Sequence, residues 1–102
     1  MKKDFQQIWL ALVGVRPIIG NDIIPDSKGA FVTVASIADN EDIFTKTIKT
    51  ILSEHKFETF EISDIENEQT ITILNPIDSE KIKLIEEIKE GYNFAWGTFH
   101  TF

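Results

Sequence analysis

Residues 30–66, AFVTVASIADNEDIFTKTIKTILSEHKFETFEISDIE, decide the fold, because they switch from strand to helix periodicity and back again. Ala30 to Ala38 is rich in β-branched residues, as strands are. Asp39 or Asn40 can cap a helix in which apolar residues then recur every three or four positions. Its expected buried stripe is Ile43, Phe44, Thr47, Ile48, Ile51, Leu52 and His55. Phe57 to Glu66 returns to a strand pattern, so this stretch predicts a strand, a helix packed on the sheet and a second strand.

The residues that follow predict a β-hairpin built on Phe57 to Glu66. Asn67 and Glu68 can form a tight turn, and Gln69 to Asn75 (QTITILN) alternates isoleucine with threonine as a returning strand does. Pro76 ends the pair, because proline has no N–H to donate to a sheet.

A second helix and a last strand complete the chain. Asp78 is a good N-cap for the helix, and Gly91 suits its C-terminal cap. The expected buried stripe of this helix is Ile82, Ile85 and Ile88. Tyr92 to Phe102 (YNFAWGTFHTF) then alternates aromatic with small or polar residues, which predicts a final aromatic strand.

From Ala30 onward the elements read βαββαβ, which is the split βαβ order of ferredoxin-like domains. That arrangement predicts an α+β fold with an antiparallel sheet and both helices on one face. Phe5 to Val15 precedes these elements and has apolar residues at both its odd and its even positions. We therefore expect an extra N-terminal strand at or near a sheet edge. A chain of 102 residues with no repeat and no linker is expected to form a single domain, 1–102.

The segment Pro17 to Gly29 (PIIGNDIIPDSKG) combines many turn-forming residues with four isoleucines. Isoleucine side chains are costly to leave in water. Two interpretations follow from this conflict. In the first, the segment is an ordered loop that folds its isoleucines onto the domain; in the second, it is a mobile loop that offers them to a ligand or partner.

The charge of the chain is concentrated in one segment. The net charge is −7, and residues 57–80 hold seven acidic side chains and no Lys or Arg. Such a charge repels phosphate backbones and anionic lipid, so we expect neither nucleic acid nor membrane as a partner. The chain has no Cys, which excludes disulfides and thiolate chemistry. The N-terminal apolar run is too short to span a bilayer and lacks a signal cleavage site, so we expect a cytoplasmic protein.

The sequence carries no motif for catalysis or for a cofactor. The two histidines, His55 and His100, have no recognisable catalytic neighbours in the sequence. Asp64-x-Glu66-x-Glu68 resembles the start of a calcium loop, but the loop then lacks its glycine. We therefore expect no catalytic residue, no metal and no cofactor, and hence no enzyme.

A binding function remains as the leading hypothesis. An acidic strand with aromatic anchors is suited to a protein partner of opposite charge. The chain would be a non-enzymatic domain that inhibits a basic partner, as an immunity protein of a bacterial toxin system neutralises a nuclease-type toxin. The expected partner-binding residues are Glu58, Glu61, Asp64, Glu66, Glu68 and Trp96.

Two other functions stay open at this level. In one, the chain is a structural or regulatory subunit that assembles, for example as a homodimer, through an aromatic sheet face. In the other, it is a small enzyme or ligand-binding domain with an unrecognised pocket.

Overall fold

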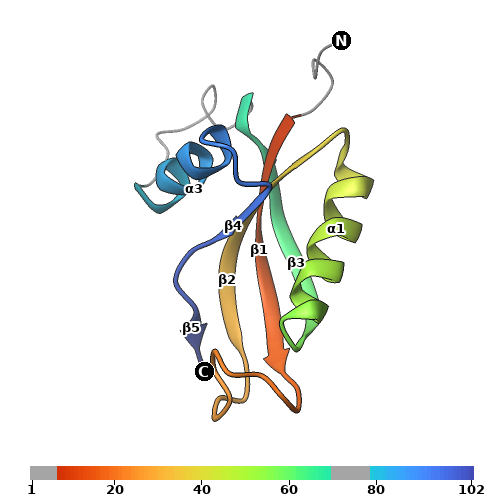
Figure 1. The fold of residues 1–102 in the computed structure, drawn as a ribbon, viewed down its shortest axis with the longest axis vertical. Helices are drawn as coiled ribbons and strands as arrows, with labels where there is room; N and C mark the ends of the chain where they lie inside the picture. The colour runs from red at the N-terminus through yellow and green to blue at the C-terminus, as the bar shows by residue number, and fades with distance from the viewer. Residues whose placement is uncertain (1–6, 70–78) are drawn as a thin grey trace.

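The computed structural model describes residues 7–69 and 79–102 and has the α+β architecture that the sequence predicts, an antiparallel sheet with two helices (Figure 1). The strands are β1 (Gln7–Pro17), β2 (Ala30–Ala38), β3 (Phe57–Asn67), β4 (Phe94–Trp96) and β5 (His100–Thr101), and the helices are α1 (Glu41–Glu54) and α3 (Ser79–Lys89). The expected N-cap Asp78 and nearly all of the expected return strand, residues 70–75, lie outside the described residues. Among the helices described, none is long and apolar enough to cross a membrane.

The N-terminal strand β1 lies inside the sheet. The strand order is β3-β1-β2-β4, with β5 also paired to β2. β1 pairs antiparallel with both β2 and β3, so those two strands are parallel to each other and α1 connects them across β1. The sequence predicts β1 at or near an edge, and its actual place corrects that expectation. A strand whose side chains are apolar on both faces buries the most apolar surface when it has neighbouring strands on both sides.

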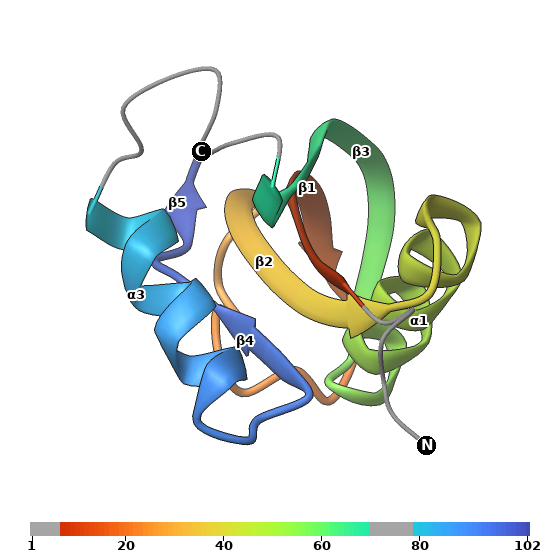
Figure 2. The ribbon, with the colours of Figure 1, turned by 90° about the horizontal axis from the view of Figure 1, so that it is seen from above.

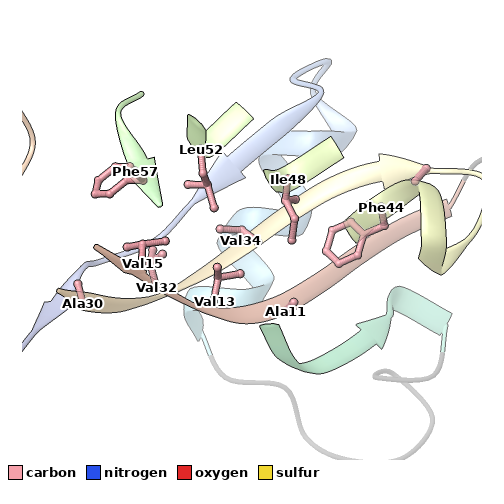
Figure 3. Packing of buried hydrophobic residues seen from close by; sticks show 11 residues of the cluster. Ala11, Val13, Val15, Ala30, Val32, Val34, Phe44, Ile48, Leu52 and Phe57 are labelled. Atoms are coloured by element: carbon pink, nitrogen blue, oxygen red, sulfur yellow. The ribbon is translucent and has the colours of Figure 1, made fainter. Parts of the chain in front are cut away.

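The two helices cover opposite faces of the sheet (Figure 2), which differs from the expectation that they share one face. Under α1 lies a cluster of buried residues (Figure 3): Ala11, Val13, Val15, Ala30, Val32, Val34, Ala38, Phe44, Ile48, Leu52 and Phe57. Under α3 lies a second cluster: Ile8, Leu10, Ala35, Leu84, Ile85, Ile88 and Ala95. β1 and β2 present apolar side chains on both faces, and each face therefore requires its own cover.

The helix ends follow from local chemistry. Asn40 is the N-cap of α1, and its side chain accepts a hydrogen bond from the backbone N–H of Ile43 at 2.9 Å. After α3, Gly91 takes a φ of 120°, a left-handed conformation that glycine adopts at low cost. Both predicted stripes need correction. In α1, Ile43 is 42% exposed and His55 is exposed as well; in α3, Ile82 is 41% exposed while Leu84 is buried. The apolar face of α3 is thus rotated toward Leu84.

The loop between β1 and β2 is held in place by one buried side chain. Asn21 is 6% exposed, and its Nδ2 donates to the carbonyl oxygens of His55 and Lys56 at 3.1 Å. Its Oδ1 accepts from the backbone N–H groups of Ile23 and Ile24 at 3.0 and 2.8 Å. The loop is therefore attached to the corner between α1 and β3. Its four isoleucines behave differently: Ile24 packs against the core, Ile18 and Ile23 are exposed, and Ile19 is 99% exposed.

The aromatic C-terminal segment forms two short strands where the sequence predicts one. Gly97 separates β4 from β5, and its N–H still donates to the carbonyl of Thr33 at 2.9 Å. The carboxylate of Glu80 lies against Gly97 and accepts from the backbone N–H of Thr98 at 2.8 Å. A side chain at position 97 would collide with Glu80, so the glycine permits this contact between α3 and the strand.

A candidate protein-binding surface along β3

Three phenylalanines meet on the sheet face that carries α3, and we call them the phenylalanine cluster: Phe31, Phe60 and Phe102. Phe31 lies 5.7 Å from Phe60 and 5.8 Å from Phe102 between ring centroids, and Phe60 lies 6.3 Å from Phe102. Phe31 and Phe60 are half-buried, whereas Phe102 is 60% exposed. The cluster therefore presents aromatic surface to solvent.

Two glycines make room for the phenylalanine cluster. A Cβ added to Gly14 would lie 2.6 Å from Cζ of Phe60 and 3.0 Å from Cε1 of Phe31. A Cβ added to Gly29 would lie 2.6 Å from Cζ of Phe102. The rings thus sit directly on the backbone of the sheet, and even an alanine at either position would force them to move.

A bulge in β3 brings Phe60 to this face. Val15 pairs with Thr59 while Gly14 pairs with Glu61, so Phe60 is an extra residue in the ladder. Strict alternation would place Phe60 and Ile62 on the same side of the strand. Instead Phe60 joins the phenylalanine cluster, and Ile62 packs against the core under α1. Phe60 is not among the binding residues expected from the sequence.

Three of the expected acidic residues stand exposed along β3, and we call them the β3 acidic patch: Glu58, Glu61 and Asp64. Positions three apart on a strand are about 10 Å apart. The guanidinium of Arg16 lies 4.0 Å from the carboxylate of Glu58 and 4.3 Å from the ring centroid of Phe60. An exposed ion pair of this length is weak, so it leaves Glu58 able to bind another cation. The acidic patch and the phenylalanine cluster therefore adjoin at Arg16.

Asp64 occupies a second irregularity of β3. Leu12 pairs with Ser63 and Leu10 with Glu66, which leaves Asp64 and Ile65 opposite a single residue of β1. Asp64 has a φ of 52°, in the left-handed region that aspartate tolerates better than most residues. The bulge keeps this carboxylate in solvent although the strand continues to Asn67.

The other two expected acids bind α3. Glu66 Oε1 lies 2.7 Å from Nζ of Lys81, and Glu68 Oε2 lies 2.7 Å from Nζ of Lys89. Both lysines belong to α3, so these pairs attach the helix to the end of β3. Of the five acids that the sequence singles out, the structure therefore separates three solvent-exposed ones from two that hold the fold together.

Trp96 lies apart from the acids. It belongs to β4, which flanks β2 on the side away from β3. Its ring contacts Phe57, Phe94 and Phe99 at centroid distances of 6.2, 5.7 and 5.1 Å, on the face covered by α1. Trp96 thus reaches β3 at Phe57 on the face covered by α1, whereas Glu58 and Glu61 pair with Arg16 and Gly14 beside the phenylalanine cluster on the other face.

Comparisons of the chain with protein-family models, with curated proteins and with solved structures gave no match. Within residues 7–69 and 79–102, no group of three or more His, Asp or Glu side chains is placed to hold a metal ion.

Proposed function

We propose that this chain is a non-enzymatic, cytoplasmic protein-binding domain that neutralises a basic partner protein, as immunity proteins neutralise toxins. The observation that carries the proposal is the juxtaposition of the β3 acidic patch with the phenylalanine cluster. The carboxylates attract and orient a basic surface, and the aromatic rings supply apolar contact once the surfaces meet.

The rigidity of the patch favours binding. β3 pairs with β1 from Phe57 to Asn67, so Glu58 and Glu61 are carried by a backbone that is already ordered. Binding then costs less conformational entropy than it would from a flexible acidic tail. The net charge of −7 adds long-range attraction for any basic protein.

A nuclease-type toxin is the partner class that this surface fits. A nuclease holds phosphates with Lys and Arg side chains, and those side chains also bind carboxylates. The β3 acidic patch would occupy that basic site and prevent the nucleic acid from entering. Inhibition would therefore result from occlusion and would require no chemistry from the inhibitor.

The experiment compares two variants with the same change in charge. In the first, Glu58, Glu61 and Asp64 are replaced by lysine; Glu66 and Glu68 are kept because they bind Lys81 and Lys89. In the control, three exposed acids on other segments are replaced by lysine: Asp26, Asp39 and Glu86. Partners are recovered from native extract with the tagged wild-type chain, and the association rate of each variant is measured at low and moderate salt.

We expect reversal of the β3 acidic patch to lower the association rate about 10- to 100-fold at low salt. The control should have a much smaller effect, because its charges lie elsewhere on the surface. If the recovered partner is a nuclease, equimolar wild-type chain should also stop substrate cleavage. Equal losses in both variants would mean that only net charge matters, and the proposal of a β3 surface would then be wrong.

Self-assembly is the second candidate, and the exposure of Phe102 favours it. An aromatic surface of this kind can instead be covered by another copy of the chain. Sedimentation at micromolar concentration distinguishes the two functions. A dimer that Phe102→Ser converts to a monomer would favour assembly, and a wild-type monomer would favour the binding domain.

A further inference from the structure

An open hollow of about 400 Å³ lies at the sheet edge formed by β4, beside the C-terminal end of α3. It is lined by Glu87, Glu90, Tyr92, Phe94, Ala95 and Trp96. β4 and β3 lie at opposite edges of the sheet, so this hollow is separate from the surface along β3.

The apolar part of the hollow is aromatic: Tyr92 follows α3, and Phe94 and Trp96, which are partly buried against the cluster under α1, line the hollow at the edge strand β4. The rings of Phe94 and Trp96 meet edge to face, with centroids 5.7 Å apart and planes at 83°. Tyr92 is 62% exposed and makes no ring contact with another described residue, so its ring face is open to a ligand. The faces of tyrosine and tryptophan rings carry partial negative charge and attract cations.

The polar wall of the hollow is negative. Glu87 lies in the last turns of α3 and Glu90 directly after it, and neither carboxylate forms an ion pair within residues 7–69 and 79–102. The C-terminal end of a helix adds a partial negative charge at the same place. None of the six lining residues is basic. Every charge at this site therefore favours a cation.

We propose that this hollow binds a guanidinium group, the head of an arginine side chain. Guanidinium is planar and weakly hydrated, so it stacks on aromatic rings while its N–H groups donate to carboxylates. An ammonium group is more strongly hydrated and has no plane to stack, so lysine should bind less well. The site does not depend on the β3 acidic patch, and each can fail without the other.

The test uses the full ¹⁵N-labelled chain and Nα-acetyl-arginine methylamide as the probe. The chain has two tryptophans, and the indole N–H of Trp9 donates to the carbonyl of Ala38 at 3.1 Å, which makes it an internal reference. We expect the Trp96 indole signal to shift saturably, with an affinity on the order of millimolar, while the Trp9 signal stays in place. The citrulline analogue has the same shape without the charge and should cause no shift.

A matched pair of variants tests the carboxylates. Glu87→Gln with Glu90→Gln should weaken binding of the probe about 5-fold or more, because charge-assisted hydrogen bonds are lost. Glu54→Gln with Glu86→Gln removes the same charge at exposed positions outside the hollow and should change it less than about 2-fold.

Three results would overturn the proposal: no saturable shift of Trp96, equal binding of the citrulline analogue, or equal weakening in both double variants. Free L-arginine, titrated in parallel, identifies the source of the ligand. Its α-carboxylate is repelled by Glu87 and Glu90, so weaker binding than the blocked derivative assigns the site to a peptide side chain. Tighter binding also supports a guanidinium site and assigns it to a free small molecule.

Discussion

Asn21 offers a sharp test of how the β1–β2 loop is held, through the substitution Asn21→Ala. The substitution removes four hydrogen bonds, two donated to the carbonyls of His55 and Lys56 and two accepted from the N–H groups of Ile23 and Ile24. A typical hydrogen bond contributes about 0.5–1.5 kcal/mol net, so four sum to about 2–6 kcal/mol. Water can reach much of this loop and replace some of them, which favours the lower end, about 2–3 kcal/mol.

The assay is urea denaturation of Asn21→Ala beside Asn93→Ala. Asn93 is exposed, and the hydrogen bonds it makes with Ser36 and Ile37 use only its backbone carbonyl, so its substitution should change the free energy of unfolding by less than about 0.5 kcal/mol. Hydrogen exchange provides a local reading, because the amide of Ile24 should lose protection in Asn21→Ala. A loss below about 1 kcal/mol with unchanged exchange at Ile24 would refute the argument that this side chain holds the loop.

Two further predictions concern the helices. Lys56 follows α1 with a φ of 66°, so Lys56→Gly should stabilise the domain by about 0.5–1 kcal/mol in thermal unfolding, while Lys49→Gly inside α1 should destabilise it by about 1 kcal/mol. A loss of stability in Lys56→Gly would contradict the left-handed cap. Leu84→Ala should cost about 2–5 kcal/mol because Leu84 is buried under α3, whereas Ile82→Ala should cost less than about 1 kcal/mol; the reverse order would mean that α3 packs by the face expected from the sequence.

The candidate surface depends on features that no local pattern reveals. Counting charges was enough to find Glu58, Glu61 and Asp64, because an acidic run without any base is visible in the sequence. The same count could not separate them from Glu66 and Glu68. Those two acids meet lysines of α3 that lie 15 and 21 positions further along the chain. Such pairs form only when the helix docks on the strand.

The positions of the aromatic residues Phe60 and Trp96 could not be predicted from the local sequence either. Alternation along β3 assumes a regular strand, and a bulge at Phe60 changes which face that ring occupies. The signal that could have located it is Gly14, the residue across from the bulge, whose missing side chain leaves room for the ring. Trp96 is prominent in the sequence, but its strand β4 is separated from β3, which carries the acids, by β1 and β2.

The sequence by itself determined the elements. The strand at Ala30–Ala38, the helix capped by Asn40 and the left-handed turn at Gly91 all follow from sterics and hydrogen bonds within a few neighbouring residues. The concentration of negative charge is likewise a property of the chain itself.

Only the tertiary structure decided how those elements are assembled. β1 became a central strand, and the helices took opposite faces, because β1 and β2 together present two apolar faces that must both be covered. Burial of apolar area lowers the free energy of any fold that covers both faces. Which of these folds forms depends on contacts between residues far apart in the chain. For the same reason, the neighbours of each exposed carboxylate were settled only when the sheet and α3 came together.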